Sequence, residues 1–83
     1  MSTQDRDAQL TILFESILGL PKEQFNDDTS TDNTAGWESV AHLNLIMAIE
    51  ETFGISFMPE DTMEMTSVRL IKLVLDENER AKL

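Results

Sequence analysis

The 83-residue sequence contains no cysteine and no tyrosine, and its aromatic residues are four phenylalanines and one tryptophan. Without cysteine the chain has no disulfides, no thiolate metal ligands and no thiol nucleophile. Few aromatics among many Leu, Ile, Met and Glu residues favour helices over a sheet. No apolar run approaches the ~18 residues of a membrane span, and the N-terminus lacks the basic-then-apolar order of a secretory signal. These absences predict a cytoplasmic protein.

Basic residues are also scarce. Six Lys and Arg stand against sixteen Asp and Glu, which gives a formal net charge of −10. Such a charge repels nucleic acid phosphates and anionic membrane surfaces, so we expect no nucleic acid partner and no membrane insertion. Proteins with basic surfaces are the natural partners. The same charge also keeps a small protein soluble, and it does not identify a function by itself.

The length of the chain allows one domain with one modest hydrophobic core. We expect a single, monomeric domain over residues 1–83. Its ends are expected to fray at residues 1–4 and 79–83, where the final segment is densely charged.

Apolar residues recur every three or four positions in parts of the chain, which predicts an all-α fold. The expected main helices cover residues 5–18, 39–53 and 67–78. Gly19 and Gly54 follow the first two, as is common at helix ends, and Pro59 predicts one short acidic helix. In the last helix the residues expected to be buried are Val68, Leu70, Ile71, Leu73, Val74 and Leu75. The result is a small bundle of three main helices plus one short helix.

A long loop is expected between the first and second helices, over residues 20–38. This segment has no sustained period and is rich in Asn, Asp, Ser, Thr and Gly, which favour turns. Loops of this length in compact domains are usually functional or disordered. Leu20, Phe25 and Trp37 offer apolar anchors that would hold the loop against the core.

The second helix has two apolar stripes on a helical projection. The stripe expected to face the core contains Leu45, Ile46, Ile49 and Phe53. The second stripe lies on the opposite side and contains Val40, Leu43 and Met47. It either packs against another helix of the bundle or forms a docking surface for a partner or a bound apolar chain.

Ser39 stands at the start of this helix, where a serine is most often an N-terminal cap. His42 follows three residues later in place of Glu or Gln, so the reciprocal capping box is absent. A helix N-terminus also stabilises an attached phosphate through its free N–H groups and its dipole. Ser39 is therefore suited either to capping or to carrying a phosphodiester.

The segment GWESVAHLNLIMAIEETFGISF resembles the second helix of acyl carrier and thiolation domains, whose signature is an Asp-Ser-Leu triplet opening such a helix. The spacing from Ser39 to the Glu50-Glu51 pair and to Phe53-Gly54-Ile55 follows the family pattern without a gap. So does the spacing to the stretch Met65-Thr66-Ser67-Val68. The resemblance covers roughly residues 7 to 78.

This resemblance implies that a phosphopantetheinyl transferase moves 4′-phosphopantetheine from coenzyme A onto Ser39. Acyl groups would then be tethered as thioesters on its thiol, in a discrete acyl carrier protein that is not an enzyme and has no catalytic residues. The implied partners are acyl-loading and acyl-processing enzymes with basic docking surfaces, in fatty-acid, polyketide or related natural-product biosynthesis. The residues that the resemblance assigns to partner recognition are Glu38, Val40, Leu43, Met47, Glu50, Glu51, Glu60, Asp61 and Glu64.

Two residues depart from the family triplet, Glu38 in place of Asp and Val40 in place of Leu. Together with Trp37 and Asn44, these departures resemble a specialised carrier more than the housekeeping fatty-acid carrier. Two alternatives stay open at this point. One is an aminoacyl or peptidyl carrier of nonribosomal synthesis, and the other is a non-covalent acidic helical adaptor without the arm.

Other chemistry finds little support in the sequence. Asp28, Ser30 and Asp32 begin like a calcium-binding loop, but Asn33 replaces the required Gly and Ser39 the bidentate Glu. We therefore expect no metal site. No serine–histidine–acid set can be assembled at sensible spacing, and no Gly-rich phosphate loop is present.

Overall fold

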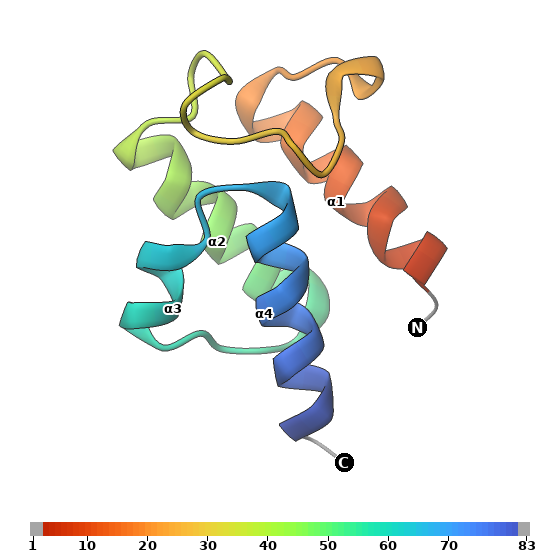
Figure 1. The fold of residues 1–83 in the computed structure, drawn as a ribbon, viewed down its shortest axis with the longest axis vertical. Helices are drawn as coiled ribbons and strands as arrows, with labels where there is room; N and C mark the ends of the chain where they lie inside the picture. The colour runs from red at the N-terminus through yellow and green to blue at the C-terminus, as the bar shows by residue number, and fades with distance from the viewer. Residues whose placement is uncertain (1–2, 82–83) are drawn as a thin grey trace.

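A computed structural model describes residues 3–81 of the chain, and the side chains of residues 5–79 (Figure 1). The elements in chain order are α1 (Thr3–Leu18), the short 3-10 helix η1 (Lys22–Gln24), α2 (Ser39–Phe53), α3 (Pro59–Glu64) and α4 (Val68–Ala81). Within the described residues there are three long α-helices, one short α-helix and no β-strand. The predicted all-α fold is confirmed.

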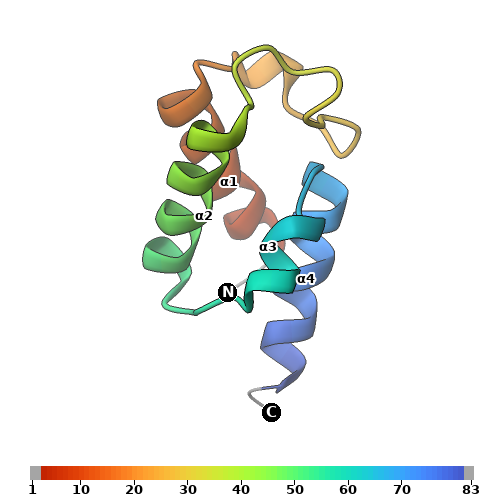
Figure 2. The ribbon, with the colours of Figure 1, turned by 90° about the vertical axis from the view of Figure 1, so that its left-hand side faces the viewer.

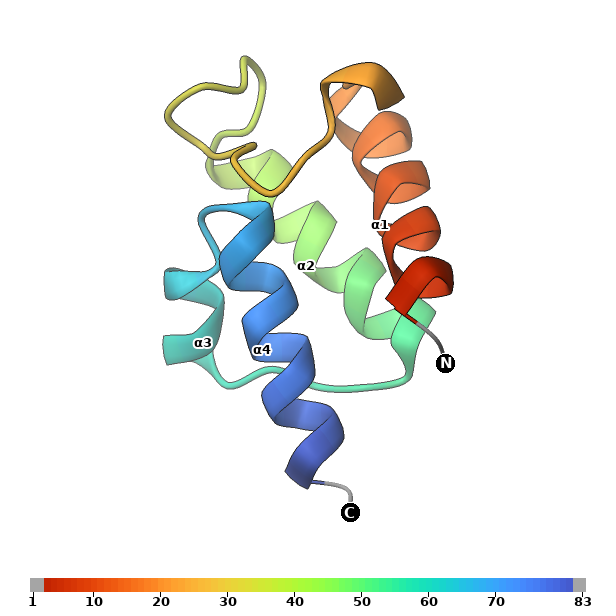
Figure 3. The same ribbon diagram turned by 45° about the vertical axis from the view of Figure 1, so that its right-hand side comes forward.

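The helices surround one core, with α1 packed against α2 and α4 crossing in front of α2 in the view of Figure 1. The short helix α3 lies at one side, and the long loop between α1 and α2 closes one end of the bundle. Both ends of the described chain lie away from this loop (Figures 1 and 3).

Glycine and proline mark the helix boundaries. Gly54 adopts the left-handed conformation with φ 67°, and its N–H donates to the Glu50 carbonyl to end α2. Pro59 is in the first turn of α3. The first and last helices extend past the expected limits at residues 5 and 78. The predicted fraying of the ends stays a prediction, and residues 1–2 and 82–83 lie outside the described part.

The long loop contains one helical turn that the sequence does not predict. In η1 the Gln24 N–H donates to the Pro21 carbonyl at 2.9 Å. Pro21 has φ −60°, a value that the proline ring imposes and that suits the start of such a turn. A single 3-10 turn needs no repeated apolar pattern, so periodicity gives no sign of it.

The middle of the loop is fixed to the segment that precedes α4. Ser30 and Ser67 form an isolated antiparallel bridge. Beside it, the Thr31 N–H donates to the Thr66 carbonyl at 3.0 Å. These backbone contacts join parts of the chain that are far apart in sequence, and they determine the course of the loop toward α2.

The core forms where the predicted apolar faces meet. Its buried members are Leu10, Phe14, Leu20, Trp37, Leu45, Ile46, Ile49, Met65, Val68, Ile71, Val74 and Leu75. Phe53 is half-buried against this cluster, so the predicted core stripe of α2 is confirmed. The loop anchors also behave as predicted, since Leu20 and Trp37 are buried and Phe25 packs edge-on against Phe14 with ring centroids 5.0 Å apart.

The predicted burial of two residues in α4 is wrong. Leu70 is 37% exposed and Leu73 is 50% exposed. Only one face of α4 contacts the bundle, and that face is filled by Val68, Ile71 and Val74. Leu70 and Leu73 project outward because no further element covers the opposite face within the described chain.

Candidate functional site

Ser39 is the first residue of α2, and it is exposed. The N-cap position belongs to Glu38, which has extended backbone angles and makes no side-chain capping hydrogen bond. The interpretation of Ser39 as a simple N-cap is therefore wrong. Its hydroxyl is presented to solvent from the first turn of the helix.

The start of α2 offers backbone donors near that hydroxyl. The His42 N–H makes the first helical bond, to the Glu38 carbonyl at 2.7 Å. The N–H groups of residues 39–41 precede this bond and have no partner in the helical ladder. A phosphate on Ser39 would lie next to these donors and the positive end of the helix dipole. The residues present thus fit a phosphodiester at this position.

A chain of hydrogen bonds joins the loop, α2 and α3 beside Ser39. The Trp37 Nε1–H donates to His42 Nδ1 at 3.0 Å, and His42 Nε2 lies 2.8 Å from the Thr62 carbonyl oxygen. Because the indole nitrogen can only donate, His42 Nδ1 is the acceptor of this bond, and His42 Nε2–H donates to the Thr62 carbonyl oxygen. The predicted loop anchor Trp37 is therefore also linked to α3, through His42.

The second apolar stripe of α2 faces solvent. Val40 is 69% exposed, Leu43 61% and Met47 63%. No helix of the described chain covers these side chains, so the interpretation that they pack inside the bundle is wrong. An exposed apolar stripe of this kind is a candidate docking surface.

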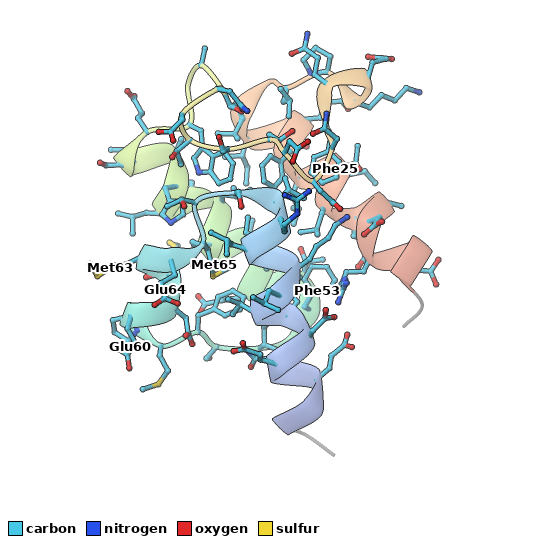
Figure 4. All side chains as sticks on the ribbon, viewed as in Figure 1. Phe25, Phe53, Glu60, Met63, Glu64 and Met65 are labelled. Carbon is cyan, nitrogen blue, oxygen red and sulfur yellow. The ribbon has the colours of Figure 1, made fainter. Side chains whose placement is uncertain are left out.

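The short helix α3 adds two apolar residues that the sequence analysis missed. Met58 is 58% exposed and Met63 is 79% exposed, and Met63 projects from α3 at the edge of the molecule (Figure 4). They lie in or next to a helix of six residues, which is too short for a periodic pattern to separate exposed from buried positions. Figure 2 shows the face on which α2 and α3 both lie.

The carboxyl groups of this region differ in their surroundings. Glu38, Glu51, Glu60 and Glu64 are exposed, and Asp61 is half-buried. Glu50 is half-buried too, and its Oε2 accepts a hydrogen bond from the Phe57 N–H at 2.8 Å. Glu50 therefore stabilises the connection to α3, a role that the sequence analysis did not foresee.

The acidic character of this face follows from where the basic residues lie. Residues 39–64 contain five Asp and Glu and no Lys or Arg. Lys72 of α4 instead binds Asp7 at 3.2 Å and Asp27 at 2.7 Å, and Arg69 binds Asp28 at 3.0 Å. These two basic side chains of α4 thus pair with carboxylates of the loop and α1, while α2 and α3 contain no basic residue of their own.

These ion pairs shift two pKa values. The hydrogen bond from Lys72, with the charges of Lys72 and Arg69, holds the pKa of Asp27 below its ordinary value. Partial burial alone would lower the pKa of Lys72, but its bonds to Asp27 and Asp7 outweigh burial, so the pKa of Lys72 is raised.

The described residues contain neither a cluster of metal ligands nor a membrane-spanning helix. No three or more His, Cys, Asp or Glu side chains come together there in a way that could hold a metal ion. Asp28, the first residue of the calcium-like pattern, pairs with Arg69. In the same part of the chain, no helix is both long and apolar enough to span a membrane.

Comparison with known families now identifies the class of protein. Residues 8–74 match the profile of the family described as phosphopantetheine attachment site. The chain belongs to this family of phosphopantetheine-binding carriers, as its resemblance predicts.

The curated relatives narrow the class to acyl carriers. The chain is 33% identical over 67 residues to the acyl carrier protein of Guillardia theta, an alignment covering 81% of this chain and 82% of that protein. Identity to the acyl carrier protein of Cyanidium caldarium is 34% over 61 residues, or 72% and 71% of the two chains. The acyl carrier protein of Chloroherpeton thalassium is 29% identical over 69 residues, an alignment that covers 83% of this chain and 86% of that protein. The protein is thus a non-catalytic acyl carrier with covalently attached 4′-phosphopantetheine.

Proposed function

We propose that Ser39 is the attachment point of the phosphopantetheine arm, and that the protein presents acyl groups to enzymes of fatty-acid, polyketide or related biosynthesis. The observation that carries this proposal is the exposed Ser39 hydroxyl at the N-terminus of α2, next to an exposed apolar stripe. When attached, the arm supplies a terminal thiol that holds acyl groups as thioesters. A chain without cysteine has no other thiol.

Attachment is a phosphoryl transfer that requires coenzyme A and a phosphopantetheinyl transferase. The Ser39 oxygen forms a bond to the phosphorus that carries the pantetheine group, and the pyrophosphate bond of coenzyme A breaks to release adenosine bisphosphate. The hydroxyl proton passes to a base of the transferase or to water. Free N–H groups at the start of α2 stabilise the resulting phosphodiester.

The docking surface that we propose consists of the α2 stripe and the acidic residues around it. Its members are Glu38, Val40, Leu43, Met47, Glu50, Glu51, Glu60, Asp61 and Glu64. Complementary charge would speed association with basic partner surfaces, and the apolar side chains would supply contact area. The acyl carrier relatives favour acyl cargo over aminoacyl or peptidyl cargo. Monomeric state and cytoplasmic location stay predictions.

The test is intact mass after incubation with coenzyme A, magnesium and a broad-specificity phosphopantetheinyl transferase. We expect the wild type to gain one phosphopantetheine unit and Ser39→Ala to gain none. Ser56→Ala, which changes another exposed serine, serves as the matched control and should be modified like the wild type. Circular dichroism should show that both variants stay helical.

Modification of Ser39→Ala would contradict the assignment of the site. No mass gain in the wild type with several transferases would instead favour the non-covalent adaptor. In that case Glu38 and Val40 would mark a modification site that has been lost.

A further inference from the structure

His42 is the only histidine of the chain, and it lies in the first turn of α2, three residues after Ser39. The two side chains line the same hollow of the surface. His42 uses both ring nitrogens, since Nδ1 accepts the Trp37 Nε1–H at 3.0 Å and Nε2–H donates to the Thr62 carbonyl oxygen at 2.8 Å. Nδ1 can accept a hydrogen bond only while it carries no proton. The link between the long loop and α2 therefore depends on the protonation of one side chain.

Trp37 has few other ways to satisfy its indole N–H. It is only 4% exposed, and its ring packs edge-on against Phe14 with ring centroids 5.1 Å apart. A buried donor that loses its acceptor costs free energy, so a change at His42 Nδ1 is transmitted to the indole ring. Trp37 directly precedes Glu38, the N-cap of α2, and stands two residues before Ser39. The bond from Trp37 thus holds the backbone at the point where Ser39 is presented.

Protonation of His42 breaks this bond and leaves the other one. A proton taken from water onto Nδ1 turns that nitrogen into a donor, which then faces the indole N–H of Trp37, also a donor. The Nε2–H group still donates to the Thr62 carbonyl oxygen, so α2 stays linked to α3. Histidine is the side chain that ordinarily changes charge between about pH 5 and pH 8. Mild acid should therefore release the end of the long loop while α2 and α3 keep their contact.

The other charged groups around His42 respond to a different pH range. The carboxyl groups that stand nearest in sequence on the adjoining elements are Asp32 in the loop, Glu38 at the start of α2, and Asp61 and Glu64 in α3. None of these four forms an ion pair with His42, and residues 23–68 contain no Lys or Arg. Carboxyl groups ordinarily titrate near pH 4, so a change from about pH 7.5 to about pH 5.5 acts on the histidine and leaves carboxylates ionised.

We propose that His42 is a positioning residue for the attachment of phosphopantetheine, and that its protonation is a switch that loosens the backbone at Ser39. The inference rests on the proposed function, because it concerns the loading of Ser39. With His42 uncharged, the bond from Trp37 holds the N-terminus of α2 in the form that the transferase meets. With His42 charged, residues 37–39 lose this restraint, and Ser39 is correctly placed in fewer encounters with the transferase. Loading therefore weakens in mild acid for a reason that lies in the carrier.

The single tryptophan makes the first half of the proposal measurable by NMR on the unmodified protein, because the isotope-labelled chain has one indole N–H signal. We expect this signal to move between about pH 7.5 and about pH 5.5 together with the ring C–H signals of His42. His42→Gln is the matched variant, since its amide oxygen can accept from Trp37 and its amide nitrogen can donate to Thr62, but it does not titrate. The indole signal of this variant should stay constant.

The second half is measured as kcat/KM of a phosphopantetheinyl transferase for each carrier, from initial rates followed by intact mass. Dividing the wild-type value by that of His42→Gln at each pH removes the pH dependence of the transferase itself. We expect this ratio to fall about fivefold between about pH 7.5 and about pH 5.5, as most of the histidine becomes charged. Trp37→Phe keeps a ring against Phe14 but has no N–H to donate, so its loading should be slower than that of His42→Gln by the same factor at both pH values.

Circular dichroism at both pH values should show that the wild type and both variants stay helical. An indole signal that does not follow the histidine overturns the switch, and so does a constant ratio of kcat/KM in a wild type that is fully loaded. Loading of Trp37→Phe that depends on pH as the wild type does overturns the route through Trp37. These results leave the proposed function intact, because Ser39 is still modified. Absence of any mass gain in the wild type overturns the proposed function and the positioning role together.

Discussion

Met47 and Ile49 lie two positions apart on α2 and have opposite surroundings. Met47 is 63% exposed, whereas Ile49 is fully buried. We expect Met47→Glu to change the free energy of unfolding by less than about 0.5 kcal/mol, because the new charge remains in water. The same change should lower kcat/KM of a partner enzyme for the loaded carrier about tenfold, since it disrupts the apolar centre of the docking surface.

Ile49→Ala provides the comparison for this experiment. Loss of a fully buried side chain should lower the free energy of unfolding by about 2–5 kcal/mol. Thermal unfolding and partner kinetics, measured on both variants, separate docking from packing. A large loss of stability in Met47→Glu would place Met47 in the core.

Sequence patterns predicted individual residues of the site but not the contacts among them. Helical spacing separated the exposed stripe of α2 from its buried stripe, and composition indicated Trp37 as a loop anchor. The bond from His42 to Thr62 spans twenty positions, so no local pattern reveals it. The same limit applies to Glu50, whose bond to Phe57 depends on how the chain turns after Gly54.

At the scale of elements, Gly54 ends α2 in a conformation that other residues adopt with difficulty. Its φ is 67°, and a Cβ placed there meets nothing within 4 Å. Gly54→Ala should therefore lower the free energy of unfolding by about 1 kcal/mol through backbone strain alone. Chemical denaturation of this variant beside Ser56→Ala, a nearby exposed position without positive φ, provides the measurement. Equal stability of the two variants would contradict this role for Gly54.

The helices themselves were the most predictable part of the fold. Apolar periodicity, Gly54 and Pro59 gave the number and order of the α-helices. Periodicity cannot reveal how many faces of a helix are covered, which is why the exposure of Leu70 and Leu73 was not foreseen. The exposure of the methionines in and next to the six-residue helix α3 was not predicted, because fewer than two helical turns contain no repeated pattern.

At the scale of the molecule, Lys72 links α1, the long loop and α4 through Asp7 and Asp27. The lowered pKa of Asp27 means that its ionised form stabilises the folded state. This contribution is present above the unfolded pKa, near 4, and is lost as the pH falls through the folded value. Asp27→Asn should thus lower stability near neutral pH, by up to about 1 kcal/mol for an ion pair whose carboxylate is half-exposed.

Denaturation curves from about pH 7 to about pH 3 test this prediction. The difference in stability between the wild type and Asp27→Asn should shrink as the pH falls. Asp32→Asn removes an exposed carboxyl of the same loop and should change stability little. If the difference in stability between the wild type and Asp27→Asn stayed constant down to about pH 3, the charge of Asp27 would not be the cause of that difference. Lys72 has the opposite pH dependence. Because its pKa is raised in the folded state, its charge stabilises the fold at neutral pH, and this stabilisation is lost at high pH as Lys72 deprotonates.

The long loop before Ser39 is held in place by residues at and before α4, which are synthesised after Ser39. Thr31 bonds to Thr66, and Asp27 bonds to Lys72. Because a chain emerges from the ribosome N-terminus first, Ser39 appears well before the residues that hold its loop in place. A transferase that recognises the folded surroundings of Ser39 would therefore modify finished chains and leave nascent ones untouched.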